Sequence, residues 1–279
     1  APFSASSQCL ACHNGMTGAD GRDLSIGAQW RGSVMGHAAR DPYWQAGVRR
    51  EVTDFPEHQT AIEAECSICH MPMDRILRRQ AGGQGVIFAN LAQGIADMNA
   101  PNGPLAADGV SCTVCHQILP DGLGQRSSFV GNFAIDTTTP AGARKAFGPF
   151  EVALGQTRIM QSASGFVPQA SDVIRKSEMC ASCHTLYTHT LAKGAEGARP
   201  FPEQVPYLEW KHSDYAGSQD CQDCHMKVVP HPAPIASVMA PLRDKTAQHL
   251  FRGGNFFLLG LLSRHRAELT LDATTGELA

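Results

Sequence analysis

Cys9-Leu-Ala-Cys12-His13 is the first of five stretches in which a Cys-x-x-Cys pair is followed directly by histidine. The other four are Cys66-Ser-Ile-Cys69-His70, Cys112-Thr-Val-Cys115-His116, Cys180-Ala-Ser-Cys183-His184 and Cys221-Gln-Asp-Cys224-His225. This pattern is the attachment motif of c-type haem. Two thiols one helical turn apart can each form a thioether with a haem vinyl group, and the next residue places an imidazole beneath the iron.

Cys-x-x-Cys pairs also occur in zinc sites and in thioredoxin-like redox centres, and ten cysteines could form disulfides. Each of these alternatives leaves the five histidines unexplained. The sequence therefore predicts five covalently bound haem c groups. All ten cysteines would serve as attachment points, with five proximal iron ligands: His13, His70, His116, His184 and His225.

The composition predicts a core made largely by these haems. The chain has 279 residues with 27 Gly and 17 Pro, and its hydrophobic share of 43% includes the ten cysteines. Five haems could supply the missing apolar bulk. We therefore expect a mainly α fold with much irregular loop structure and little β, wrapped around a haem stack.

The motif positions divide the chain into three parts. Residues 1–120 hold haems 1–3, residues 121–175 form a haem-free connection or small β-rich insertion, and residues 176–279 hold haems 4 and 5. A shared haem stack could join these parts into one compact unit. Asp41-Pro42 predicts a helix through Glu51, a second helix is expected from about Pro56 to Cys69, and an amphipathic C-terminal helix from 256 to about 269.

Seven further histidines can supply the distal ligands of five irons. His37 lies far enough after His13 for the chain to return across a haem face. His189 and His231 follow the proximal His184 and His225 so closely that they should serve adjacent haems. The predicted distal ligands are His37, His58, His189, His212 and His249, with His231 as a further candidate.

Two of the seven histidines lie on predicted helices. His58 shares a helix face with Cys66 and Cys69, so it leaves from the proximal side of haem 2 and suits a neighbouring haem better. His265 lies at the edge of an apolar helical stripe, where a non-ligand role is at least as plausible, and it is assigned to no iron.

Charge and hydropathy bear on partners and location. With 23 basic and 26 acidic residues the net charge is -3, so we expect neither nucleic acid nor an anionic membrane as a partner. No apolar run approaches the ~20 residues of a membrane span. The first residues, Ala1-Pro-Phe-Ser, are typical of a mature N-terminus after signal cleavage, and haem attachment takes place outside the cytoplasm. We expect a periplasmic or extracellular protein.

Five stretches of the sequence resemble those of a known family: residues 31–44, residues 65–73, residues 201–210, residues 221–226, and His249 with the Gly-Gly-Asn at 253–255. They resemble multihaem cytochromes c of the cytochrome c554-like group. The resemblance covers most of the chain. It implies a haem-stacked, helical and loop-rich electron carrier outside the cytoplasm, with mostly bis-histidine haems.

Three functions stay open at this point. The first is extracytoplasmic electron transfer through five closed haems, with redox proteins as partners and no catalytic residue. The second is a reductase or oxidase with one open, five-coordinate haem acting on nitrite, hydroxylamine or sulfur oxyanions. The third is a homo-oligomer or extracellular filament in which subunits share a distal histidine. Because seven histidines can close every iron, the first is favoured over enzyme activity.

Overall fold

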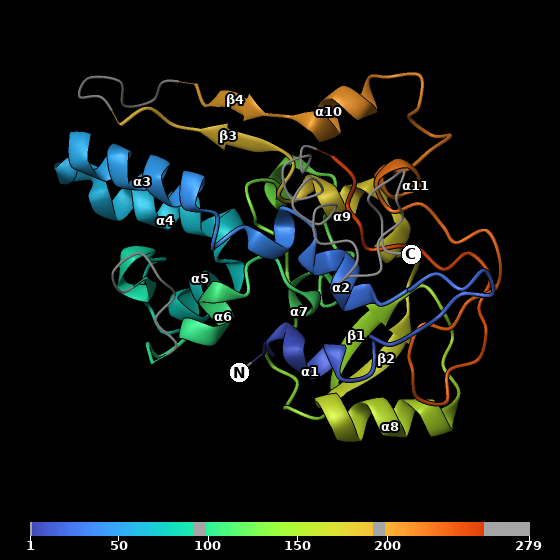
Figure 1. Ribbon diagram of the computed structural model, residues 1–279. Coiled ribbons are helices and arrows are strands. Elements are labelled where there is room, and N and C mark those ends of the chain that lie inside the picture. Colours follow the sequence, from blue (N-terminus) through green and yellow to red (C-terminus); the bar gives the residue numbers. More distant parts are fainter. Residues whose placement is uncertain (1, 92–98, 192–198, 254–279) are drawn as a thin grey trace.

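The computed structural model describes residues 2–91, 99–191 and 199–253, and most of its regular structure is helical (Figure 1). The helices are α1 (Ser6–Leu10), α2 (Ile26–Arg31), α3 (Pro42–Asp54), α4 (Gln59–His70), α5 (Pro72–Gln80), α6 (Gly103–Ala107), α7 (Cys112–Cys115), α8 (Leu154–Ser164), α9 (Ser177–Ala181), α10 (Pro206–Lys211) and α11 (Cys221–His225). The strands are β1 (Arg144–Gly148), β2 (Phe166–Ala170), β3 (Leu186–Thr188) and β4 (Phe201–Gln204). The predicted mainly helical, loop-rich fold with little sheet is confirmed.

The longest helix among the described residues, α3, begins as its sequence predicts. Asp41 is the N-cap and its carboxylate accepts a hydrogen bond from the N–H of Tyr43, while Pro42 occupies the first turn. The second predicted helix is also present, but its first three residues, Pro56–His58, form a 3-10 turn before α4. His58 therefore lies outside the regular α-helical face that it was predicted to share with Cys66.

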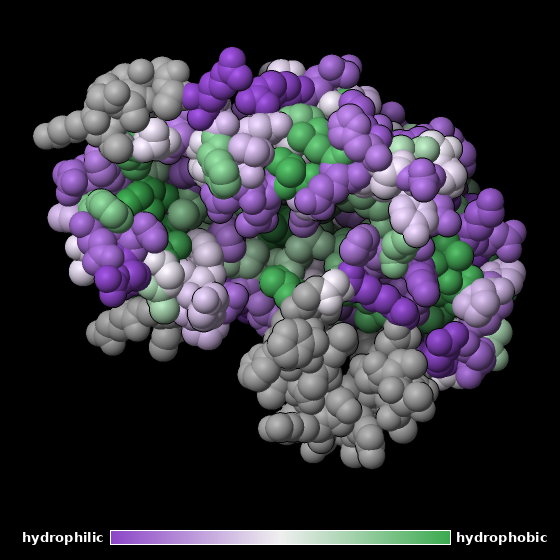
Figure 2. Space-filling model, turned by 90° about the horizontal axis from the view of Figure 1, so that it is seen from above, coloured by the Kyte–Doolittle hydropathy of each residue, from purple (hydrophilic) through white to green (hydrophobic). Residues whose placement is uncertain are grey.

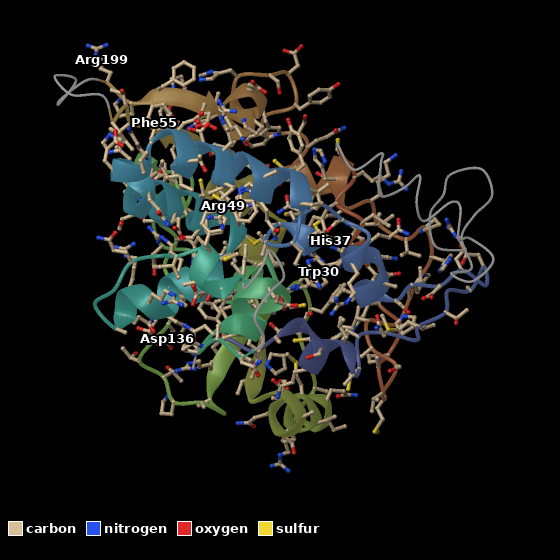
Figure 3. All side chains as sticks on the ribbon, turned by 60° about the vertical axis from the view of Figure 1, so that its left-hand side comes forward. Trp30, His37, Arg49, Phe55, Asp136 and Arg199 are labelled. Carbon is tan, nitrogen blue, oxygen red and sulfur yellow. The ribbon has the colours of Figure 1, made fainter. Side chains whose placement is uncertain are left out.

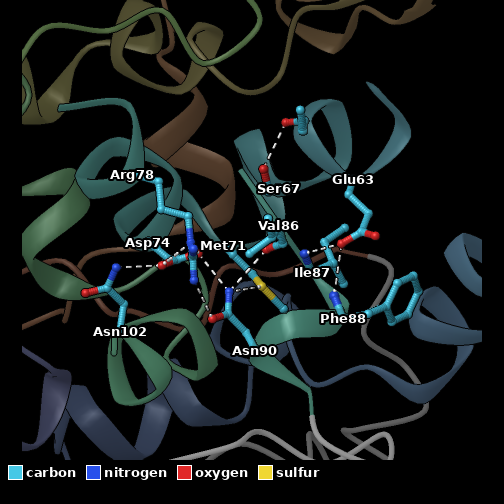
Figure 4. A network of polar contacts seen from close by, with 11 residues as sticks. Glu63, Ser67, Met71, Asp74, Arg78, Val86, Ile87, Phe88, Asn90 and Asn102 are labelled. Atoms are coloured by element: carbon cyan, nitrogen blue, oxygen red, sulfur yellow. Dashed lines mark hydrogen bonds and ion pairs between the residues drawn. The ribbon is translucent and has the colours of Figure 1, made fainter. Parts of the chain in front are cut away.

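A buried carboxylate holds α5 to the segment that follows it (Figure 4). Asp74 is fully buried, and the single N–H of Arg78 Nε is shared between its two carboxylate oxygens, at 2.8 and 2.9 Å. Asn90 and Asn102 donate to the same carboxylate at 2.7 and 2.8 Å. Every lone pair of Asp74 is thus engaged, which offsets the cost of burying its charge.

Residues 121–175 contain two paired strands together with a helix that was not predicted. β1 and β2 pair in parallel, in register from Arg144 with Phe166 to Gly148 with Ala170. Parallel neighbours need a crossover, and α8 provides it. Gly165 ends α8 with φ of +77°, a left-handed conformation that favours glycine.

The rest of the second half consists of short elements. β3 and β4 form an antiparallel ribbon along the top of the molecule in Figure 1, and Figure 3 places Arg199 at its outer end. α10 and α11 follow β4. The predicted helix at 256–269 and His265 lie outside the described residues.

Apolar side chains of the described residues are divided among four small clusters. One packs α3 against Met71 and Ile87. Another joins Phe3, Met73 and Val114 to Cys183, so it brings the N-terminus and two of the five motifs together. On the face seen from above, apolar residues lie in recesses between hydrophilic ones (Figure 2). No described helix is long and apolar enough to cross a bilayer.

Candidate functional site

Each of the five motifs lies on a helical turn. Motifs 2 and 5 end α4 and form α11. In the other three, the histidine N–H donates to the carbonyl of the first cysteine, as His13 does to Cys9 at 3.0 Å. The turn brings the two sulfurs to one side, and the histidine emerges beside them. This is the local geometry that the spacing predicts.

Backbone carbonyls orient four of the five motif imidazoles. Nδ1 of His13 donates to Ile235 O at 2.6 Å, His70 to Ala38 O at 2.7 Å and His116 to Phe147 O at 2.6 Å. His225 makes the same contact with Arg252 O. Because a carbonyl only accepts, Nδ1 carries the proton, and Nε2 of the neutral ring keeps its lone pair.

Burial keeps several of these rings neutral. It lowers the pKa of His70, His116 and His184, with the nearby His225 adding to the effect at His184. His70 is held in a second way by Trp44 of α3, whose ring stacks on it with centroids 4.0 Å apart and planes 4° apart. Among the motif histidines, His70 and His116 thus combine a lowered pKa with a fixed ring whose Nε2 carries the lone pair.

Cysteines of different motifs meet in the interior. The side chain of Cys9 hydrogen-bonds that of Cys112, joining motifs 1 and 3. Cys69 contacts Cys183, which joins motifs 2 and 4, and Cys180 contacts Cys221, which joins motifs 4 and 5.

Motifs 3 and 4 are also neighbours, because Cys115 lies close enough to Cys180 and Cys183 to interact with both electrostatically. The fourth motif therefore has three neighbours, motifs 2, 3 and 5. Motif 1 contacts motif 3 through Cys9.

A mainly apolar cavity of about 350 Å³ lies between motifs 1 and 3. Both cysteines and the histidine of each of these motifs line it, together with β1, α8 and the segment 235–251. Trp30 and Met160 are among the apolar side chains in its wall. Such a space suits a large, flat, apolar group attached to either motif.

His249 faces His116 in this cavity. The two rings are nearly parallel, 18° apart, with centroids separated by 6.4 Å. That separation is far larger than the 4.0 Å of the stacked Trp44 and His70. His249 is held by its main-chain N–H, which donates to Oε1 of Gln29 at 2.8 Å, and burial lowers its pKa to about 3.

The other predicted distal ligands from the first half lie close to other polar groups. His37, at the end of the 3-10 turn Met35–His37, donates from Nε2 to Arg31 O at 2.7 Å, so its lone pair is on Nδ1. Figure 3 shows it close to Trp30 in the middle of the molecule. Nε2 of His58 lies 3.8 Å from Oε1 of Glu57.

The candidates from the second half lie apart from one another. His189 is exposed and interacts electrostatically with Glu65, next to the second motif, so it is near a motif other than its own. His212, just after α10, is exposed. Nε2 of His231 lies 3.2 Å from Oδ2 of Asp20.

Sequence reasoning did not find the residues that orient the motif histidines. Ala38, Phe147, Ile235 and Arg252 act through main-chain carbonyls, which any residue type carries. Phe147 bonds His116 twice, since its N–H also donates to the carbonyl of His116 at 2.7 Å. No side-chain signal could have identified them.

The fold of the chain resembles that of a penta-haem cytochrome. The crystal structure of the penta-haem cytochrome c552 from Thermochromatium tepidum matches 94% of this chain with a TM-score of 0.55 and 17% sequence identity. The chain spans 60% of the length of that structure. No protein-family model and no curated protein sequence matches the chain. At this identity the likeness shows the shared fold.

Proposed function

We propose that this protein transfers electrons through five covalently bound haem c groups whose irons are mostly or all closed by two imidazoles. The observation that carries the proposal is the repeated anchoring of the motif histidines by main-chain carbonyls at Ala38, Phe147, Ile235 and Arg252. Histidines that bind a metal through one nitrogen characteristically donate the other to a carbonyl or carboxylate, which fixes the ring. Four separate motifs of this chain do so.

The pair His116 and His249 supports closure by two imidazoles. A metal bound between two imidazole nitrogens, at about 2.0 Å from each, separates the ring centres by roughly 6 Å. The observed 6.4 Å fits this arrangement. His249 would then be the distal partner of the third motif, and its low pKa keeps it available as a neutral ligand.

Contacts between motifs suggest the route. Motif 1 adjoins motif 3, motif 3 adjoins motif 4, and motif 4 also adjoins motifs 2 and 5. The fourth motif, at α9, would thus be a junction from which electrons reach either of two ends. His189 interacts electrostatically with Glu65 beside the second motif, so we expect it to serve that motif.

When bound, the haems supply one-electron chemistry, and the protein supplies spacing, axial ligation and local polarity. Ring orientation by the carbonyl of Phe147 makes His116 a better donor and holds it still during electron transfer. Because thioether attachment takes place outside the cytoplasm, we place the protein in the periplasm or outside the cell, with redox proteins as partners.

The direct test is the intact mass of the protein produced with extracytoplasmic haem maturation. We expect five haems per chain. After unfolding, no cysteine should react with a thiol reagent, either without a reductant or with one. The three inter-motif contacts, Cys9 with Cys112, Cys69 with Cys183 and Cys180 with Cys221, define the competing result. Thiols that appear only after reduction, with no haem mass, would identify disulfides instead and overturn the proposal.

A further inference from the structure

Two arginines from different segments meet on one phenylalanine ring. The guanidinium carbon of Arg175 lies 5.4 Å from the centroid of Phe150, and that of Arg243 lies 5.5 Å from it. Arg175 ends the 3-10 turn that follows β2, and Phe150 comes just after β1. All three side chains line the cavity between motifs 1 and 3.

Phe150 and Arg243 both lie on segments whose main chain hydrogen-bonds to a motif histidine. Phe150 comes three residues after Phe147, whose carbonyl orients His116. Arg243 pairs through its main chain with Ala233, two residues before Ile235, whose carbonyl orients His13. The positions of the Phe150 ring and of Arg243 are thus set by the same segments that orient the two imidazoles.

The cluster carries positive charge without a matching carboxylate. In residues 2–91, 99–191 and 199–253, no carboxylate lies within 4.0 Å of either guanidinium. Arg243 donates from Nη2 to the main-chain carbonyl of Glu151 at 2.8 Å, while its Nε is buried and has no hydrogen-bond partner. Two like charges beside an apolar space repel one another, and a buried donor without an acceptor costs free energy.

An anion in the cavity would remove both costs. Guanidinium groups bind carboxylates through paired, charge-assisted hydrogen bonds, and the face of Phe150 restricts where each group can lie. A haem attached through cysteines at one edge carries two propionate carboxylates at the opposite edge. It is therefore the anion that the proposed function already brings to this space.

We propose that Arg175 and Arg243 bind a propionate of the haem held in this cavity by motif 1 or motif 3. The inference rests on the proposed function. Phe150 acts as the platform that keeps the two cations in place. Two guanidinium groups beside one propionate keep a net positive charge, which favours the reduced haem because it stabilises the added electron.

The test is a spectroelectrochemical redox titration of the five-haem protein and its Arg175→Gln and Arg243→Gln variants, after intact mass has verified five haems in each. We expect one midpoint potential to fall in both variants while the others stay in place. A tenfold decrease in the equilibrium constant of reduction corresponds to 59 mV for one electron. Arg175→Lys and Arg243→Lys keep the charge and should lower the same potential less.

Arg158→Gln on the exposed side of α8 is the matched control, because Arg158 is not in the cavity wall, and it should change no potential. Unchanged potentials in the two glutamine variants would overturn the propionate assignment. The assignment would also be overturned if added nitrite shifted a potential of the wild-type protein but not of the two variants, because the arginines would then bind an external anion. Wild-type protein with fewer than five haems would instead overturn the proposed function.

Discussion

At the scale of single residues, a carbonyl opposite Nδ1 decides which nitrogen of each motif histidine is available. The bond from His116 to Phe147 O leaves Nε2 unprotonated and directed away from the strand. His249 faces this ring across 6.4 Å. The motifs were predictable from the sequence because cysteine and histidine carry their own chemistry. The carbonyl partners were not, because residues as far apart as His13 and Ile235 meet only in the folded chain.

The facing pair gives a prediction for His249. Replacing His249 with Ala should convert one low-spin haem of the oxidised protein to high-spin, because His116 would become the only axial ligand. Low-temperature EPR measures this change, and added imidazole should restore the low-spin signal. His265→Ala, at the histidine assigned to no iron, serves as the control. A fully low-spin spectrum for the His249 variant would show that another residue closes this iron.

At the scale of elements, local signals predicted some helices, whereas packing created others. Asp41-Pro42 marks the start of α3, and the cap is present. The sequence signals for the parallel strands β1 and β2 are weaker, because polar and apolar residues do not alternate clearly along Arg144–Gly148. β1 gains its partner strand only when α8 brings the chain back beside it. Its role beside His116 depends on this tertiary pairing.

Two Arg–Asp pairs at i,i+4 spacing allow a matched comparison of burial. Asp74 is fully buried and bonded by Arg78, Asn90 and Asn102. Its replacement by Ala leaves a half-buried guanidinium and two amides without the acceptor they share, and should lower the free energy of unfolding by about 3 kcal/mol. Chemical denaturation of the holoprotein measures the effect.

The control is Asp54→Ala, which breaks an exposed pair with Arg50. Surface ion pairs are screened by solvent, so this variant should unfold close to the wild-type denaturant concentration. Equal destabilisation of the two variants would contradict the view that the Asp74 network fixes α5.

At the scale of the whole molecule, motif 4 occupies the central position. Cys183 contacts Cys69, Cys180 contacts Cys221, and both lie near Cys115. The order of motifs along the chain, 1 to 5, therefore differs from their order in space, 1, 3, 4 and then 2 or 5. The sequence predicted that motifs would be cross-connected but could not give this order, because it depends on how α4, α9 and α11 pack.

A variant that lacks the fourth haem tests the junction. Replacing Cys180 and Cys183 with Ala should leave haems 1 and 3 unable to exchange electrons rapidly with haems 2 and 5. Because motif 4 also joins motif 2 to motif 5, photochemical reduction followed by haem absorbance should then show more than one phase, with haem 2, haem 5 and the pair of haems 1 and 3 each equilibrating separately. Replacing Cys9 and Cys12 with Ala removes only an end of the route, so the remaining haems should still equilibrate in one phase. One-phase equilibration in both variants would contradict a central motif 4.

The central claim is that five irons are each held by a carbonyl-anchored or otherwise fixed motif histidine and closed by a second imidazole. Low-temperature EPR of the fully oxidised protein, on material whose mass shows five haems, tests it most directly. The account predicts low-spin signals for all five irons and no change on adding nitrite or hydroxylamine. A high-spin component that shifts when either compound is added would contradict it and identify an open catalytic haem.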